Sequence, residues 1–159
     1  MKNKMYHWKF TVPVLFLAAI LLIGWAITGE KSDNQQQQRS TQPETMPLVP
    51  MMQQLLTDIQ QVDRGIYTEN FQLIGEASGR ISDHPKMIQE DKKIIKKTLG
   101  KEMKKFVSFD MRVHHHADSM RMAALQKEMQ EVLRHYRIVQ KGCVDCHSNY
   151  RKEISEVKK

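Results

Sequence analysis

Apolar residues recur every three or four positions from residue 48 onward, which is the period of amphipathic helices rather than of strands. A first helix is expected to begin near Pro50, since proline suits the first turn of a helix. Its apolar positions are Met52, Leu55, Leu56, Ile59, Val62 and Ile66. A second helix carries its apolar face on Phe71, Ile74, Ala77 and Ile81. It is expected to end at Asp83-His84-Pro85, because the residue before a proline avoids the helical conformation.

The second half of the sequence repeats the helical pattern. A helical stretch around Gln89 to Leu99, closed by Gly100, links the two halves. A third helix is expected from near Lys101, with Phe109 or Asp110 at the boundary of its apolar face. That face carries Phe106, Val113, Ala117, Met120 and Ala124. A fourth helix carries Met129, Val132, Leu133, Tyr136, Val139, Cys143 and Cys146. Four such helices with short links predict an all-α antiparallel four-helix bundle over residues 48–159.

The N-terminal part of the sequence has a different character. Three lysines precede an uncharged, mostly apolar run from Phe10 to Thr28, close to the ~20 residues that span a bilayer as a helix. Residues 1–29 therefore predict a single N-terminal transmembrane helix. A cleaved secretory signal is the alternative, although the apolar run is long and no Ala-x-Ala site follows it.

Both interpretations of the N-terminus send the rest of the chain out of the cytoplasm. We expect a single-pass protein of the bacterial cytoplasmic membrane, with its folded domain in the periplasm or on the outer face. Residues 30–47, which include a run of glutamines, are expected to form a polar flexible linker.

Composition and net charge indicate which fold and which kinds of binding partner are expected. Glycine (7) and proline (5) are scarce, as in proteins built from long helices. Much of the formal charge of +7 comes from Lys92, Lys93, Lys96, Lys97, Lys101, Lys104 and Lys105. These lysines predict either a solvated helix face or a docking surface for an acidic redox partner. No motif typical of nucleic-acid binding accompanies them, so nucleic acid is not an expected partner.

One motif carries the candidate chemistry, Cys143-Val144-Asp145-Cys146-His147, which has the C-x-x-C-H pattern of covalent haem attachment. Its two cysteines are the only ones in the chain. On a helix both thiols share a face with His147, so they reach one edge of a porphyrin while the imidazole turns to the iron. The motif predicts one haem c, attached through Cys143 and Cys146, with His147 as the proximal iron ligand.

Three other roles for the cysteines stay open on sequence alone. A thioredoxin-like pair belongs near the start of a strand-helix unit, and no such unit precedes Cys143. A zinc site needs further ligands, for which His114, His115 and His116 are the candidates. A disulfide within one helical turn is strained.

A methionine at the start of the first helix is the candidate for the second axial iron ligand, because methionine opposite histidine raises the reduction potential and suits electron transfer. Met51 and Met52 both lie there. Helical spacing does not choose between them, since Met51 precedes Leu55 by four residues and Met52 precedes Leu56 by four. A methionine at helical spacing is also an ordinary core residue.

With these residues in view, the chain resembles the class II c-type cytochromes, the cytochrome c-prime superfamily of four-helix bundles with the haem motif near the C-terminus. The likeness covers roughly residues 51–151. Beyond the haem motif it rests on Met52 to Ile59, Ile81 to Pro85, Phe106, Asp110, Val113, His114, Ala117 and Tyr150-Arg151.

The resemblance also implies which residues ligate the haem iron. The family has a low-spin branch, whose helix-one methionine ligates iron, and a high-spin branch, whose sixth position is empty. The likeness favours the ligating branch, with Met52 ahead of Met51, and leaves an open site as the alternative. His114 matches a family histidine and is expected in the core or at its boundary rather than on iron. Arg151 follows His147 by one turn and is a candidate partner of a haem propionate, or is simply solvent-facing.

The expected function is the transfer of single electrons outside the cytoplasm. An enzyme is not expected, because the chain shows no separate acid-base or nucleophile constellation. The alternative is a five-coordinate protein that binds nitric oxide or carbon monoxide opposite His147. The expected partners are redox proteins, acidic or membrane-bound, and the membrane through the N-terminal helix. Whether the domain pairs into a homodimer is left open.

Overall fold

The computed structural model describes residues 43–158, and this part of the chain is almost entirely helical, as predicted. Its elements in chain order are β1 (Thr45–Met46), α3 (Leu48–Tyr67), α4 (Phe71–Ser82), β2 (Lys86–Met87), α5 (Gln89–Leu99), the short 3-10 helix η2 (Gly100–Glu102), α6 (Met103–Leu125) and α7 (Met129–Val157). The predicted transmembrane helix lies outside the described residues. Between residues 43 and 158 no helix combines the length and the apolar character that crossing a membrane requires.

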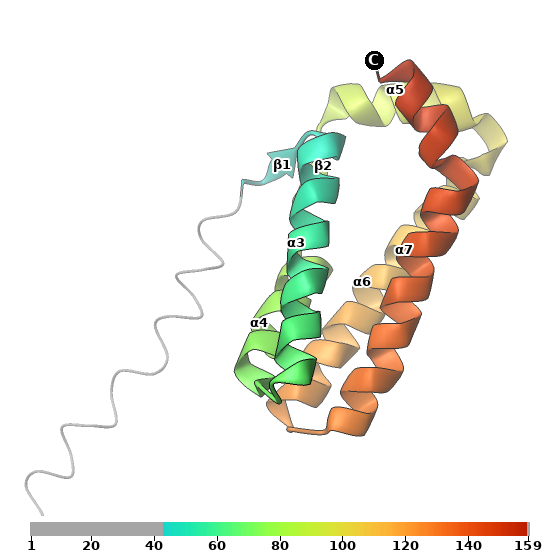
Figure 1. Cartoon of the computed structure of the whole chain (residues 1–159). Coiled ribbons are helices and arrows are strands. Elements are labelled where there is room, and N and C mark those ends of the chain that lie inside the picture. Colours follow the sequence, from blue (N-terminus) through green and yellow to red (C-terminus); the bar gives the residue numbers. More distant parts are fainter. Residues whose placement is uncertain (1–42, 159) are drawn as a thin grey trace, which may run out of the picture. The chain divides into compact units, whose positions relative to one another are not determined.

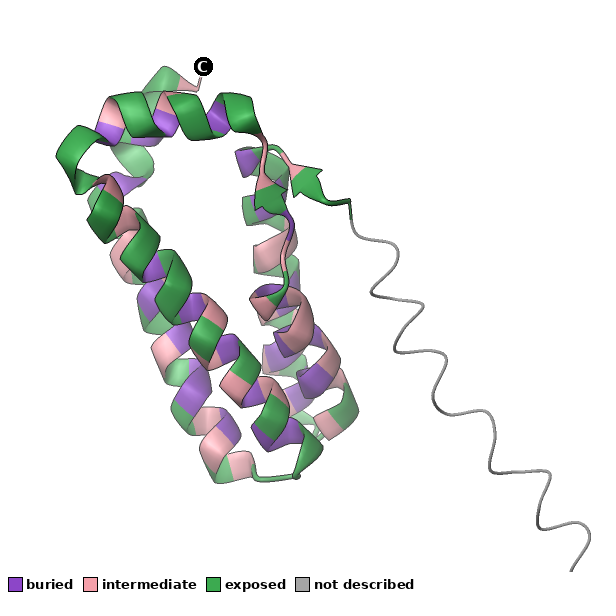
Figure 2. Ribbon diagram, turned by 180° about the vertical axis from the view of Figure 1, so that it is seen from behind, coloured by how far each residue is buried: buried purple, intermediate pink, exposed green. Residues whose placement is uncertain are grey.

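The long helices α3, α4, α6 and α7 form a bundle (Figure 1). The closest packing joins α3 with α4, α4 with α6, and α6 with α7. Helix α5 crosses the end of the bundle at which α3 begins and α7 ends. Helices α3 and α7 run antiparallel, approach each other at the opposite end and diverge toward α5, as both ribbon views show (Figures 1 and 2). Three neighbouring helix pairs are therefore closely packed, and the fourth pair, α3 and α7, is not; the side of the bundle between these two helices is called its open side below.

The buried residues form two separate hydrophobic clusters. The larger cluster joins α3, α4, α6 and α7 through Val62, Ile74, Ala77, Ile81, Val113, Ala117, Met120, Ala123, Ala124, Val132, Tyr136 and Val139. The smaller cluster joins α5 to the ends of its neighbours through Leu48, Ile95, Leu99, Phe109, Tyr150 and Ile154. Cys143 packs against the larger cluster and Cys146 against the smaller one. The cysteine motif therefore lies where the two clusters meet.

The apolar face predicted for the first helix is only partly its buried face. Val62 is fully buried, but Met52 and Leu56 are exposed. Met51 and Asp58 are buried instead. The prediction assumed that all apolar residues of this helix face one shared core, whereas α3 packs closely only on α4 and leaves its opposite side uncovered.

The boundaries of the other helices agree with the sequence. Helix α4 ends at Ser82, just before Asp83-His84-Pro85. Helix α5 has the predicted bounds and is followed by Gly100, whose φ of 49° lies in the region that glycine adopts without strain. Helix α6 begins at Met103, and of its two boundary candidates Phe109 is buried while Asp110 is exposed.

A short parallel strand pair was not predicted. Strand β1 pairs with β2 in the register Thr45 with Lys86 and Met46 with Met87. Strand β1 lies at the end of the segment expected to be a linker. Two residues per strand are too few to show an alternating pattern in the sequence. The pair holds the entrance of α3 against the connection between α4 and α5.

Alanine substitutions at two helical glycines are expected to change the free energy of unfolding in opposite directions. A Cβ on Gly65 would lie 2.7 Å from Ile74 Cγ1 and 3.1 Å from the Ile74 backbone nitrogen, so Gly65→Ala is expected to lower the free energy of unfolding by about 1–3 kcal/mol. A Cβ on Gly75 would meet only Ala124 Cβ at 3.8 Å. Gly75→Ala is therefore expected to raise stability by about 0.5–1 kcal/mol, because glycine is costly inside a helix. Urea unfolding measures both changes, and equal signs for the two variants would contradict this packing.

Candidate functional site

The cysteine motif lies in the middle of α7, which continues without a break for three turns beyond it. Both cysteines are free thiols and half-buried, while His147 is exposed. Asp145, between the cysteines, forms an ion pair of 2.8 Å with Lys141 one turn earlier. The helical conformation therefore holds the two thiols and the imidazole along one side of a continuous helix.

Burial favours the protonated form of both thiols. Burial raises the pKa of Cys143 above its ordinary range. Burial, with smaller effects from Asp110 and Cys143, raises the pKa of Cys146 to about 11. Reactive redox cysteines have lowered pKa values because the thiolate is the nucleophile. In addition, α7 follows another helix rather than a strand, so the surroundings do not resemble those of a thioredoxin-like pair.

A hydrogen bond defines which sides of α3 and α7 face each other. The Tyr136 hydroxyl on α7 donates to Asp63 Oδ1 on α3 over 2.5 Å, and Gln140 Nε2 donates to the same hydroxyl over 2.8 Å. Burial and the Asp63 carboxylate raise the pKa of Tyr136 above its ordinary value, so the hydroxyl keeps its proton. The side of each helix that carries this contact is therefore turned toward the other helix.

His147 and Met52 lie on these facing sides. His147 is eleven residues after Tyr136, and Met52 is eleven residues before Asp63. Eleven residues bring a helix back to within about 20° of its starting direction and advance it by roughly 16 Å. Because the helices are antiparallel, both residues lie on the same side of the contact, toward α5 (Figure 1).

Met51 lies on a different side of α3. It is about 100° from Met52 around the helix. It precedes Asp58 by seven residues, which is two turns, and Asp58 Oδ1 forms an ion pair of 2.7 Å with Arg80 Nε of α4. Met51 is 3% exposed and Met52 is 37% exposed. Met51 is thus a core residue on the side of α4, while Met52 stands on the open side toward α7.

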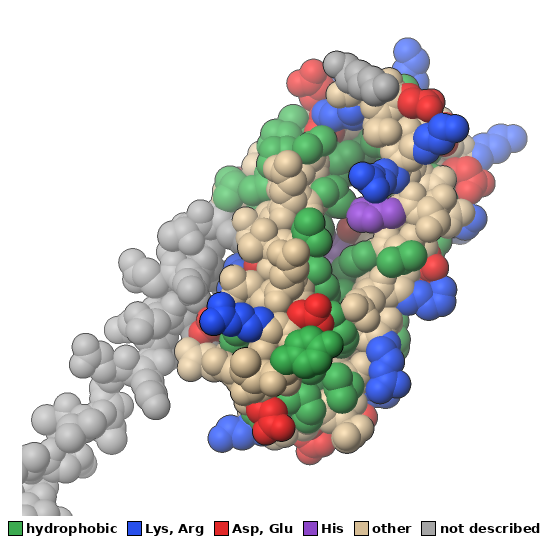
Figure 3. Space-filling view, in the orientation of Figure 1, with side chains coloured by type: hydrophobic (Ala, Val, Ile, Leu, Met, Phe, Trp, Pro, Cys, Tyr) green, Lys and Arg blue, Asp and Glu red, His purple; other side chains and the backbone are tan. Residues whose placement is uncertain are grey.

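The surface between α3 and α7 is hollowed, and hydrophobic side chains gather along it (Figure 3). Half-buried apolar side chains lie at the margins of the two clusters. They include Leu55, Ile59 and Cys143 at the larger cluster, and Met103, Phe106 and Cys146 at the smaller one. Arg151, the predicted propionate partner, is exposed on α7 one turn beyond His147.

The three adjacent histidines of α6 separate into different surroundings. His114, expected in the core or at its boundary, is half-buried and lies beside His84 and Asp110. His115 is exposed, whereas His116 Nδ1 lies 2.9 Å from Nδ1 of the buried His135. Across residues 43–158, His84, Asp110 and His114 are the one group of three or more potential ligand side chains close enough to share a metal ion. The cysteines do not belong to that group, so a zinc site built from the cysteines and these histidines is not assembled.

The sequence alone does not identify His84 and Asp110 as candidate ligands. In the sequence His84 belongs to a helix stop and Asp110 to the boundary of an apolar face. They are 26 positions apart, and no local spacing joins them, so only the packing of the α4–β2 connection on α6 brings them together.

The hydrogen bond between Tyr136 of α7 and Asp63 of α3 is expected to stabilise the fold. Tyr136→Phe is expected to lower the free energy of unfolding by about 1.5–3 kcal/mol, because it removes a short, partly buried hydrogen bond to a charged group. Tyr150→Phe is the matched control, since its hydroxyl lies 3.3 Å from an exposed Glu102 and its loss is expected to cost below about 1 kcal/mol. Equal losses in thermal or urea unfolding would contradict the importance of the Tyr136 contact.

Comparison of the chain with protein-family models, with curated protein sequences and with solved structures gives no match.

Proposed function

We propose that the chain is a mono-haem c-type cytochrome that carries single electrons, built as an antiparallel four-helix bundle of the class II type. Cys143 and Cys146 attach the haem c, and His147 is its proximal iron ligand. The observation that carries the proposal is the place of the C-x-x-C-H motif: it lies on α7, between the two hydrophobic clusters, beside the open side of the bundle.

The residues around the motif suit a flat, largely apolar group. The two thiols are free and half-buried on one side of α7. Apolar side chains gather along the hollowed surface between α3 and α7 (Figure 3). Met52 stands on the side of α3 that faces α7, which supports Met52 over Met51 as the second iron ligand.

When bound, the haem supplies the redox chemistry, since its iron takes up and releases one electron. The chain's own residues hold it: the two thioether bonds would keep it attached, and the neutral imidazole of His147 would offer a nitrogen lone pair. The Tyr136–Asp63 hydrogen bond joins α3 and α7 at the end of the bundle opposite α5. The packed larger cluster excludes water from that end, so few groups would rearrange on electron transfer.

The proposed partners follow from charge and from the N-terminus. All seven lysines of the basic face, on or next to α5 and η2, are exposed, which supports docking of an acidic redox protein by charge complementarity. Residues 1–29 would anchor the chain in the bacterial cytoplasmic membrane, and the linker would let the haem domain move on the outer face between a donor and an acceptor.

A second candidate function is the binding of nitric oxide or carbon monoxide to five-coordinate haem. The open side between α3 and α7 favours it, because Met52 is partly exposed and α3 diverges from α7 there. This candidate differs from electron transfer by a single coordination bond, from Met52 to iron.

The test uses the full-length chain produced in cells that carry a haem-ligation system. We expect a coloured protein whose haem stays with the polypeptide in acidified organic solvent. The Cys143→Ala/Cys146→Ala double variant is expected to release all its haem into that solvent. Haem that leaves the wild-type chain in the same extraction, or a colourless wild-type chain, would overturn the proposal.

A further inference from the structure

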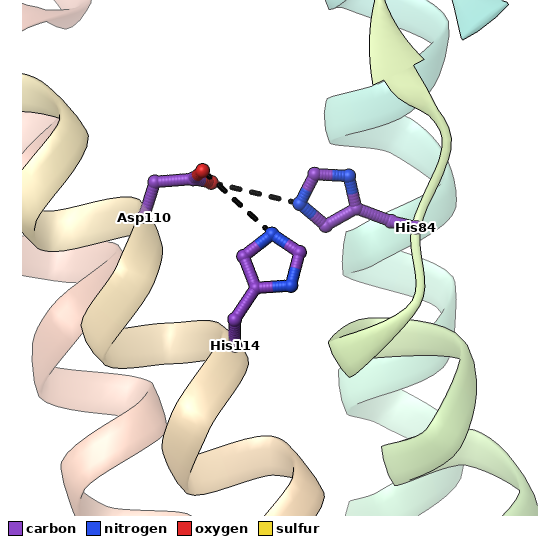
Figure 4. Close-up of side chains that lie close together, drawn as sticks. All are labelled: His84, Asp110 and His114. Carbon is purple, nitrogen blue, oxygen red and sulfur yellow. Dashed lines mark ion pairs between the residues drawn. The ribbon is translucent and has the colours of Figure 1, made fainter.

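Three side chains from two separate elements converge in a cluster that includes neither cysteine. His84 lies in the connection that follows α4, and Asp110 and His114 lie one turn apart on α6. His84 Nε2 is 3.5 Å from Asp110 Oδ1, and His114 Nε2 is 3.6 Å from Asp110 Oδ2. The two rings and the carboxylate point toward one another (Figure 4), and their three potential ligand atoms all lie within 4.8 Å of one another.

The backbone sets which nitrogen of each ring faces the carboxylate. His84 Nδ1 lies 2.9 Å from the Pro85 carbonyl oxygen, and His114 Nδ1 lies 2.5 Å from the Ser82 carbonyl oxygen. A carbonyl oxygen only accepts hydrogen bonds, so each Nδ1 carries a proton and donates. In a neutral ring each Nε2 then has a free lone pair directed into the cluster. Metal-binding histidines are held by the same kind of hydrogen bond on the outer nitrogen.

The spacing of the three groups fits an ion better than direct hydrogen bonds. Separations of 3.5 and 3.6 Å exceed the 2.7–3.2 Å usual for N–H···O hydrogen bonds. Four ligands placed tetrahedrally at about 2.0–2.1 Å from a metal are about 3.3 Å from one another. Each imidazole nitrogen therefore stands almost at that distance from a carboxylate oxygen of Asp110.

The pKa values and the solvent exposure of the cluster are compatible with a shared metal ion. Burial by itself lowers the pKa of His84, but Asp110 and the Pro85 carbonyl outweigh it and raise the pKa overall. Burial likewise raises the pKa of Asp110, but the two histidines outweigh it and lower the pKa. Both shifts have the same physical cause, the closeness of the imidazoles and the carboxylate. The side chain of His84 is 10% exposed and that of Asp110 is 48% exposed, so the cluster is reachable from solvent on the Asp110 side.

We propose that His84, Asp110 and His114 bind a divalent first-row transition-metal ion, such as Zn²⁺, with a fourth position open to water. Two imidazole nitrogens and one carboxylate suit such ions, whereas Mg²⁺ and Ca²⁺ prefer oxygen ligands alone. The site takes none of its ligands from the cysteines or His147, so its ligand set is separate from that of the proposed haem. The competing arrangement is a protonated histidine paired with Asp110, in which a proton takes the place of the metal.

The test measures Zn²⁺ binding to the full-length chain by calorimetry, after removal of bound metal with a chelator. His84→Asn and His114→Asn keep a donor near the position of Nδ1 but lack Nε2, and Asp110→Asn removes the charge. His115→Asn is the matched control, because His115 is an exposed neighbour outside the cluster. A Cys143→Ala/Cys146→Ala variant separates this site from metal binding by free thiols.

We expect one equivalent of Zn²⁺ on the wild-type chain and on both control variants. Affinity should fall at least about 100-fold in each cluster variant, since loss of an outer partner alone costs 10–100-fold. Zn²⁺ should also raise the Tm of the wild type and of His115→Asn but not that of His84→Asn. Should His114→Asn fail to fold, His84→Asn decides, because it lies outside the helices.

Three results would overturn the proposal: no stoichiometric Zn²⁺ on the wild-type chain, unchanged affinity in folded cluster variants, or loss of binding in the cysteine variant. The first would favour the protonated pair, and the last would assign the metal to the thiols.

Discussion

In the proposed cytochrome, Met52→Ala is expected to convert the haem from low-spin to high-spin, with ready binding of carbon monoxide in the reduced state, while Met51→Ala leaves it low-spin. Met52 stands on the side of α3 that faces α7, at the level of His147, whereas Met51 is buried on the side of α4. Absorption and magnetic spectra in both oxidation states measure this difference.

Met51→Ala should instead lower the free energy of unfolding by about 2–5 kcal/mol, because it leaves a cavity in the core. It therefore serves as the control for Met52→Ala. A conversion to high spin by Met51→Ala alone would show that the wrong methionine has been chosen. A wild-type chain that is already high-spin and binds carbon monoxide would favour the gas-binding function.

Asp91→Ala is expected to lower the free energy of unfolding by about 2–4 kcal/mol, because it removes a buried, hydrogen-bonded carboxylate. Asp91 is 1% exposed on α5, and its Oδ2 accepts a hydrogen bond of 2.7 Å from the backbone nitrogen of Leu48, the first residue of α3. Its other oxygen pairs with Lys158 after the end of α7. One carboxylate thus joins three helices, and its removal leaves a buried backbone donor without its partner.

Asp118→Asn is the matched control for Asp91→Ala. Asp118 also forms a short ion pair, of 2.7 Å with Arg121, but their side chains are 54% and 39% exposed. An exposed pair contributes little, so a change within about 0.5 kcal/mol is expected. Equal losses in urea unfolding would contradict the importance of burial at Asp91.

The contribution of Asp91 should also depend on pH. Burial raises its pKa, but the Leu48 amide and Lys158 outweigh burial and hold the pKa below its ordinary value of 3.8. The unfolded chain then binds this proton more readily than the folded one, so the stabilisation is complete above the ordinary pKa and is lost as pH falls through the lowered one. The difference in stability between the wild type and Asp91→Ala should therefore shrink in acid. A difference that stays constant down to pH 3 would contradict this assignment.

Helix bounds were largely predictable because they depend on local chemistry. Helix α4 ends where Pro85 excludes a further turn, and α5 has the predicted limits before Gly100. The C-x-x-C-H motif is likewise visible without a structure, since its spacing is set within one turn of one helix. The strand pair of β1 and β2 was missed because two residues carry no periodic pattern.

Contacts between distant segments could not be predicted from the sequence. Helical spacing treats Met51 and Met52 alike, and only the Tyr136–Asp63 and Asp58–Arg80 contacts show which of them faces α7. The buried position of Asp58 was also unforeseen, because a lone carboxylate gives no sign of its partner on another helix.

By itself, then, the sequence determined the mostly helical fold of residues 43–158 and the C-x-x-C-H motif on the last helix, because periodicity and motif spacing are properties of neighbouring residues. The tertiary structure alone decided that α3 and α7 diverge beside that motif and that His84 lies against Asp110 and His114. Both depend on how segments far apart in the chain pack against each other. The sequence of one segment does not specify these contacts, because each contact also depends on residues of the other segment.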